Sequence, residues 1–181
     1  MPKPGVHIPK VILYTSLSTC LASERENDIG LVKLDKSLDS TWFTSVQVAK
    51  ISDDIDFPRP GQICRIAGWG RNGGTDGNVR YAEARVVHCT TESQIFCIVP
   101  ENKDVRFVTE DYGTGIFCFK DGVPHLAGIF SDKNWGGYGY GSLRMSYYKK
   151  WIDSRIAALK CLTDKNPFRT IRCIKQNRYC Q

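Results

Sequence analysis

The feature that most constrains the fold is a succession of short β-rich segments separated by turn signals. Residues 71–78 contain four turn signals in eight positions, and Asp121-Gly122 suits the turn of a hairpin. This arrangement predicts an all-β sandwich or barrel. The segments of strand length and character are 10–16, 29–35, 44–52, 62–70, 80–89, 116–131 and 142–145.

A single helix is expected near the C-terminus, over residues 146–160. Ser146 suits the N-cap position. Ile152, Ile156 and Leu159 recur at i, i+4 and i+7, which places them on one apolar stripe. The chain therefore reads as short strands followed by one closing helix.

The cysteine content points to an oxidising compartment. Eight cysteines in 181 residues are typical of a secreted, disulfide-bonded protein. The sequence contains no C-x-x-C pair, the spacing that would indicate a zinc site. We expect no metal and no cofactor. Residues 1–10 are not a signal peptide, and no apolar run reaches the roughly 18 residues that span a membrane. A secreted composition without a secretion signal leads us to expect a fragment or an incomplete gene product.

The net charge of +6 is concentrated at the C-terminus. From Lys160 to the end, six basic residues accompany the single acid Asp164, so this segment carries +5. Such a segment is either a solvated tail or a docking patch for a polyanion or an acidic partner. Interleaved aromatic residues are few, which argues against nucleic-acid stacking. We expect neither a nucleic acid nor a membrane as partner.

Four segments, in order, resemble the trypsin/chymotrypsin family of serine endopeptidases (peptidase S1). Residues 27–34, NDIGLVKL, resemble the segment that carries the family's catalytic aspartate. Residues 61–70, GQICRIAGWG, are similar to its Gly-Trp-Gly strand. Residues 109–118, TEDYGTGIFC, fall where the family has its nucleophile turn. LAGIFS at 126–131, followed by SYYKKWIDSRI at 146–156, resembles its last strands and closing helix.

The resemblance runs from about residue 8 to 159 and covers only the later part of a family domain. It implies an antiparallel trypsin-like β-barrel with a C-terminal helix. The second barrel of the family fold would be complete and the first mostly missing. We expect a remnant of the first barrel at 1–43, the second barrel and helix at 44–160, and a basic cysteine-containing tail at 161–181.

The resemblance also implies two disulfides, Cys64–Cys118 and Cys89–Cys97. The family's further bridge beside the substrate pocket has no candidate, because Val108 stands where its first cysteine would be. The remaining four cysteines allow three pairings, which stay open. They are Cys20, Cys161, Cys173 and Cys180.

A serine protease needs a nucleophilic hydroxyl, an imidazole and a carboxylate, and the resemblance identifies only the carboxylate in this sequence. Asp28 matches the carboxylate that orients the imidazole. Tyr112 replaces the nucleophilic serine, and a phenol without an adjacent base does not attack a peptide carbonyl. The catalytic histidine has no counterpart: His7 lacks the family's context, and His88 and His125 lie downstream of Asp28.

The rest of the expected site is altered as well. Asp111 matches the aspartate that pairs with the new α-ammonium group on activation, while Glu110 replaces a glycine of the oxyanion turn. Arg106 stands at the base of the specificity pocket, where it would repel a basic side chain. Asp132 replaces a tryptophan of the pocket wall, and Trp135 could substitute for that residue in part.

These departures predict an inactive serine-protease homologue that acts by binding a protein partner rather than by proteolysis. A secreted, extracellular location follows from the cysteines and the family. Two alternatives stay open: a truncated gene product of a serine endopeptidase-like protein, and a polyanion-binding module that uses the basic tail. An active hydrolase with unusual residues is the reading that the altered site favours least.

Overall fold

The computed structural model describes residues 11–16, 27–35, 48–69, 78–132, 137 and 139–162. Several predictions fall outside these residues and stay untested. They concern His7, Cys20, Trp135, Cys173, Cys180, the boundary at residue 44 and the tail beyond residue 162. The side chain of Cys161 also lies outside the described part.

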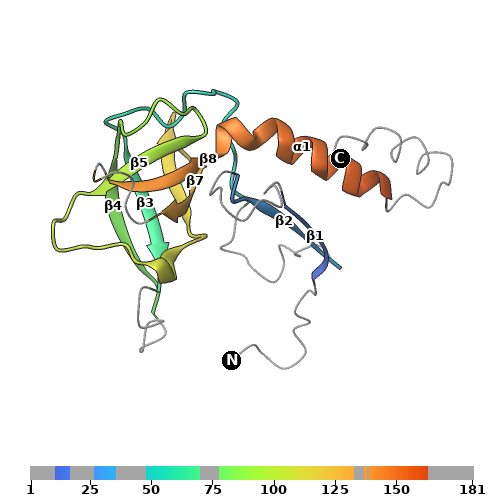
Figure 1. Ribbon diagram of the computed structural model, residues 1–181, viewed down its shortest axis with the longest axis horizontal. Coiled ribbons are helices and arrows are strands. Elements are labelled where there is room, and N and C mark those ends of the chain that lie inside the picture. The colour runs from blue at the N-terminus through green and yellow to red at the C-terminus, as the bar shows by residue number, and fades with distance from the viewer. Residues whose placement is uncertain are drawn as a thin grey trace.

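Six antiparallel strands form a closed barrel in the order β3-β4-β5-β8-β7-β6 (Figure 1). The β6–β7 hairpin turns at Asp121 and Gly122, which have φ of 52° and 74°, as expected for this dipeptide. The strands are β3 (Ile63–Gly68), β4 (Arg80–Val87), β5 (Ile95–Pro100), β6 (Gly115–Lys120), β7 (Val123–Asp132) and β8 (Tyr140–Arg144).

The barrel interior is filled by alternate residues of its strands. In β3, Cys64 and Ile66 are buried while their neighbours in the strand are exposed. Burial alternates with a period of two because successive side chains of a strand point to opposite faces and only one face lies inside the barrel. Phe130 on β7 and Ile98 on β5 are fully buried in the same cluster. The barrel is therefore a packed core rather than a channel.

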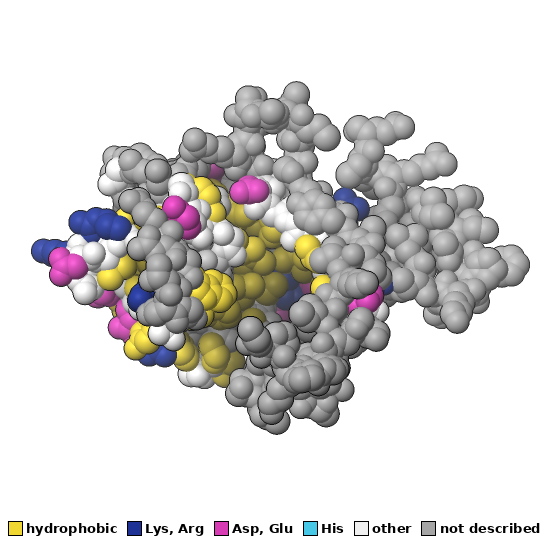
Figure 2. All heavy atoms as spheres, turned by 90° about the horizontal axis from the view of Figure 1, so that it is seen from below, with side chains coloured by type: hydrophobic (Ala, Val, Ile, Leu, Met, Phe, Trp, Pro, Cys, Tyr) yellow, Lys and Arg dark blue, Asp and Glu magenta, His cyan; other side chains and the backbone are white. Residues whose placement is uncertain are grey.

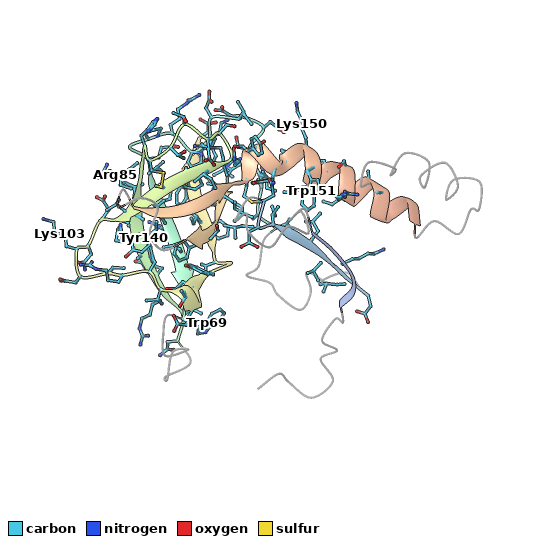
Figure 3. All side chains as sticks on the ribbon, viewed as in Figure 1. Trp69, Arg85, Lys103, Tyr140, Lys150 and Trp151 are labelled. Atoms are coloured by element: carbon cyan, nitrogen blue, oxygen red, sulfur yellow. A yellow bond between two sulfur atoms is a disulfide. The ribbon has the colours of Figure 1, made fainter. Side chains whose placement is uncertain are left out.

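A second hydrophobic cluster lies between the outer surface of the barrel, a small sheet and the helix. The sheet pairs β1 (Val11–Ser16) with β2 (Gly30–Leu34), and the helix α1 spans Met145–Leu162. Ile29, Leu143 and Ile152 are buried in this cluster. Trp151 on α1 is oriented toward β2 (Figure 3).

The predicted all-β fold with a closing helix is confirmed, but three local predictions are wrong. Residues 48–52 form no strand; only Lys50 makes an isolated bridge, to His125. Strand β5 was not expected, because Ile95–Ile98 is buried at four successive positions and shows no alternation. Ser146 is not the N-cap: the helix begins at Met145, and the Ser146 hydroxyl donates to the carbonyls of Ile55 and Phe57.

The small sheet predicts self-association. Among the described residues it has two strands, so each strand has one edge that no described strand covers, and Val32 on β2 is 52% exposed. Exposed strand edges recruit further strands. We expect sedimentation velocity to show concentration-dependent association, which Val32→Lys reduces. A single monomeric species for the unmutated chain at every concentration would contradict this expectation.

Candidate functional site

The turn expected to carry the nucleophile is a short 3-10 helix, Thr109–Asp111, followed by Tyr112. Tyr112 is extended, with φ of −60° and ψ of 141°. Gly113 has φ of +82°, a conformation that suits glycine because a side chain would be strained there. The N–H of Gly113 donates to the carbonyl of Phe130 over 2.8 Å, which attaches the turn to β7.

Asp111 is held inside this turn by its own loop and by the end of β3. Its side chain is 9% exposed, and its Oδ2 accepts the backbone N–H of Val108 over 3.1 Å. Its Oδ1 lies against Gly68, where an added Cβ would approach to 2.8 Å. The glycine of the Gly-Trp strand therefore makes room for this carboxylate.

The ring of Tyr112 packs edge-on against Phe130, with ring centroids 5.3 Å apart. Phe130 also contacts Phe107 at 5.7 Å and Tyr140 at 5.9 Å, and the last two contact each other at 5.0 Å. We call Phe107, Tyr112, Phe130 and Tyr140 the aromatic cluster. Figure 3 shows Tyr140 within the barrel. Tyr112 is the exposed member, at 42%, and covers the buried Phe130.

The aromatic cluster occupies the region in which the resemblance places the specificity pocket. Phe107 follows Arg106, the residue expected at the pocket base. Asp132, expected on the pocket wall, is the last residue of β7 and pairs with Gly141, the neighbour of Tyr140. Sequence reasoning missed this cluster, because aromatic residues in strands usually signal only core packing and no local spacing joins these segments.

Arg106 is exposed and directs its guanidinium at its own loop. Its Nη1 donates to the backbone carbonyls of Lys103 and Val105, the latter over 2.8 Å. The guanidinium therefore does not take part in the aromatic packing behind Tyr112.

The oxyanion turn is also rearranged. The resemblance led us to expect the backbone N–H groups of Glu110 and Tyr112 to point toward a common anion. The N–H of Tyr112 instead donates to the carbonyl of Thr109 over 3.1 Å, within the 3-10 helix. The exposed Glu110 carboxylate accepts the Thr109 hydroxyl over 3.0 Å beside it. One of the two expected donors is thus used inside the turn, and a negative charge lies next to the other.

Asp28 lies two residues before β2. Its side chain is exposed, whereas the preceding Asn27 accepts the Tyr148 hydroxyl over 3.1 Å. His88 is exposed just after β4. His125 lies on β7, with its ring 5.8 Å from Phe57 and its Nδ1 3.0 Å from the Val123 carbonyl.

Both disulfides that the resemblance implied are present. Cys64–Cys118 joins β3 to β6 directly across their pairing, and Cys89–Cys97 closes a short loop before β5. Within the described ranges, no group of three or more His, Cys, Asp or Glu residues could hold a metal ion. No described helix is long and apolar enough to cross a membrane.

Comparison with known protein families agrees with this geometry. The family model described as Trypsin matches residues 5–152, which is most of the chain. The chain belongs to the trypsin family. The closed antiparallel barrel and the C-terminal helix are consistent with the all-β fold of that family.

Proposed function

We propose that this trypsin-family protein is not an endopeptidase and acts by binding. The observation that carries the proposal is the position of Tyr112. The residue expected at the nucleophile turn is a phenol that packs against Phe130, and the sequence has no histidine in the context that carries the family's general base. A hydroxyl needs an adjacent general base to take its proton before it attacks a peptide carbonyl.

The aromatic cluster supports the same proposal. Peptide cleavage requires a substrate side chain to enter the specificity pocket, so that the scissile carbonyl is positioned at the turn. Phe107 and Phe130 are buried in that region, at 7% and 0% exposure. The barrel retains its core and its disulfides, so the chain keeps a stable scaffold on which binding surfaces can be carried.

We further propose an extracellular location and a protein partner. The two disulfides persist in oxidising compartments, and trypsin-family proteins fit such a compartment. The alternative of a truncated gene product differs in one observable respect: a longer native transcript would supply an upstream segment with the histidine. Tyr112 would remain in either case.

The polyanion-binding alternative rests on the basic tail, 161–181, which lies beyond the described helix. Heparin-column retention decides it, because a tail-based site requires retention to fall when residues 161–181 are deleted. Retention that survives the deletion would remove this alternative.

A fluorophosphonate probe tests the main proposal. We expect no covalent labelling of the purified chain under conditions that fully label active trypsin. We also expect Tyr112→Ser to remain unlabelled and to hydrolyse no peptide substrate, because the restored hydroxyl still has no base. Labelling of the unmutated chain at any serine would overturn the proposal. Labelling of the variant at residue 112 would show that a functional base is nearby.

A further inference from the structure

A pocket of about 490 Å³ lies between the loop before β3 and the first turns of α1. The loop contributes Asp53 and Ile55, and the helix contributes five side chains between Ser146 and Asp153. In Figure 1 this loop and the start of α1 lie at the top of the molecule, on the side opposite to the one viewed in Figure 2. The volume is within the usual range of small-ligand sites.

Hydrogen bonds hold the two walls of this pocket together. The Ser146 hydroxyl donates to the carbonyl of Phe57 over 2.8 Å, and Ser146 is buried. Arg144, which precedes the first residue of the helix, donates to the carbonyls of Asp56 and Pro58 over 3.2 and 2.8 Å. The loop and the helix start are therefore fixed relative to each other, which lowers the entropy that a ligand loses by ordering its site.

Two side chains offer apolar surface to a ligand in the pocket. Ile55 on the loop is 51% exposed and Tyr147 on the helix is 42% exposed, and both line the pocket. The Tyr147 ring is supported by the buried Tyr148, with ring centroids 5.1 Å apart. A branched aliphatic and an aromatic side chain at a concave surface suit an apolar ligand body.

The negative charges of the pocket gather around Lys149. Its Nζ donates to Asp53 Oδ1 over 3.2 Å and to Asp153 Oδ2 over 2.7 Å. Two carboxylates thus share one ammonium group, which leaves one excess negative charge around it. Each carboxylate uses one oxygen in these bonds, so the second oxygen can accept a hydrogen bond from a ligand.

Lys150 supplies the opposite charge. It lines the pocket, is exposed, and makes no hydrogen bond or ion pair with another residue that the structure describes. Tyr147 and Lys150 are three residues apart on a helix, so their side chains are neighbours on its surface. The pocket is therefore neutral as a whole but separates its charges, with an acceptor side around Lys149 and a donor at Lys150 beside the Tyr147 ring.

We propose that this pocket binds a small zwitterion with an aromatic or branched apolar body, the chemistry of an apolar α-amino acid. The ammonium group of the ligand would contact Asp53 or Asp153, its carboxylate would contact Lys150, and its body would lie on Tyr147 and Ile55. A simple anion would gain Lys150 but approach two carboxylates, and a simple cation would meet the reverse. This inference goes beyond the proposed function and does not depend on whether the chain cleaves peptides.

Three ligands with a common phenyl body test the proposal on the full-length chain. The probes are L-phenylalanine, the anion 3-phenylpropionate and the cation 2-phenylethylamine, titrated while ¹H–¹⁵N spectra are recorded. We expect saturable shifts, with L-phenylalanine about threefold to fivefold tighter than either single ion, because exposed charge pairs contribute modestly. Non-saturable binding of L-phenylalanine, or a single ion that binds as tightly, would overturn the proposal.

Substitution of Lys150 tests the carboxylate contact. Lys150→Gln is expected to weaken L-phenylalanine binding by about threefold and not to weaken 2-phenylethylamine binding. Lys103→Gln removes an equal charge from an exposed position that lies far from Lys150 (Figure 3), and it is the control. Equal effects of the two substitutions would attribute binding to net charge and overturn the assignment.

Substitution of Asp53 tests the ammonium contact with the opposite ligand. The Asp53 side chain is 91% exposed, and Lys149 keeps its bond to Asp153 when Asp53 is replaced. Asp53→Asn is therefore expected to weaken L-phenylalanine and 2-phenylethylamine binding by about threefold and to leave 3-phenylpropionate binding no weaker. Near-ultraviolet circular dichroism checks that each variant stays folded. Loss of all three ligands by a folded Asp53→Asn variant would contradict the proposed orientation.

Discussion

Phe130→Ala lowers the free energy of unfolding by about 3–5 kcal/mol, the largest effect that we expect from a single substitution. Phe130 is fully buried, and its ring contacts Phe107, Tyr112 and Tyr140. Alanine removes the whole ring and leaves a cavity that a closed barrel cannot collapse around. Urea unfolding monitored by circular dichroism measures the change.

Phe119→Ala is the matched control, because Phe119 is an aromatic residue of the neighbouring strand β6 that is 42% exposed. Its substitution is expected to cost under about 1 kcal/mol. If both variants lose the same stability, the aromatic cluster is not the centre of the barrel core. If Phe130→Ala unfolds the chain completely, Phe130→Leu, which keeps most of the volume, gives a measurable intermediate loss.

Removal of the Cys64–Cys118 disulfide as a double alanine variant is expected to destabilise the chain by about 4 kcal/mol. The two cysteines are 54 residues apart and fully buried, so the cross-link restricts a long loop of the unfolded chain. Both residues lie in the barrel core, and alanine therefore also leaves a small packing defect. Denaturant midpoints of the purified variant and the unmutated protein measure the difference.

The second disulfide supplies the comparison. Cys89 and Cys97 are only 8 residues apart, and the same chain-entropy relation gives about 2.5 kcal/mol for the paired alanine variant. The order of the two losses is the informative result. A larger loss for the Cys89–Cys97 pair would mean that local strain or residual structure, rather than loop length, decides how these bonds stabilise the barrel.

Several features could be predicted from residues that are close in sequence. The Asp121-Gly122 turn was predictable because both residues readily adopt positive φ. The strand β3 was predictable because apolar and polar residues alternate where one face of a strand is buried and the other is exposed. The absence of a serine at residue 112 and of a histidine in the family's context needed only the sequence and the resemblance.

Other features escaped local reasoning because they depend on neighbours that are distant in sequence. Strand β5 has no alternation, since its buried run leaves no exposed face to create a period. Residues 48–52 have strand-like composition but form only one bridge, and Val48 is 97% exposed. A strand needs a partner along its length, and sequence composition does not supply one.

The sequence by itself determined that this chain is an all-β protein of the trypsin family with a tyrosine at residue 112, because strand periodicity, turn residues and motif order are local properties. Only the tertiary structure decided what surrounds Tyr112. Closure of the barrel brings Phe107, Phe130 and Tyr140 together from three separate segments. The same closure brings Arg106, Trp69 and Tyr81 to the lining of one cavity at the barrel end, because strand pairing and packing, rather than spacing along the chain, determine which segments converge.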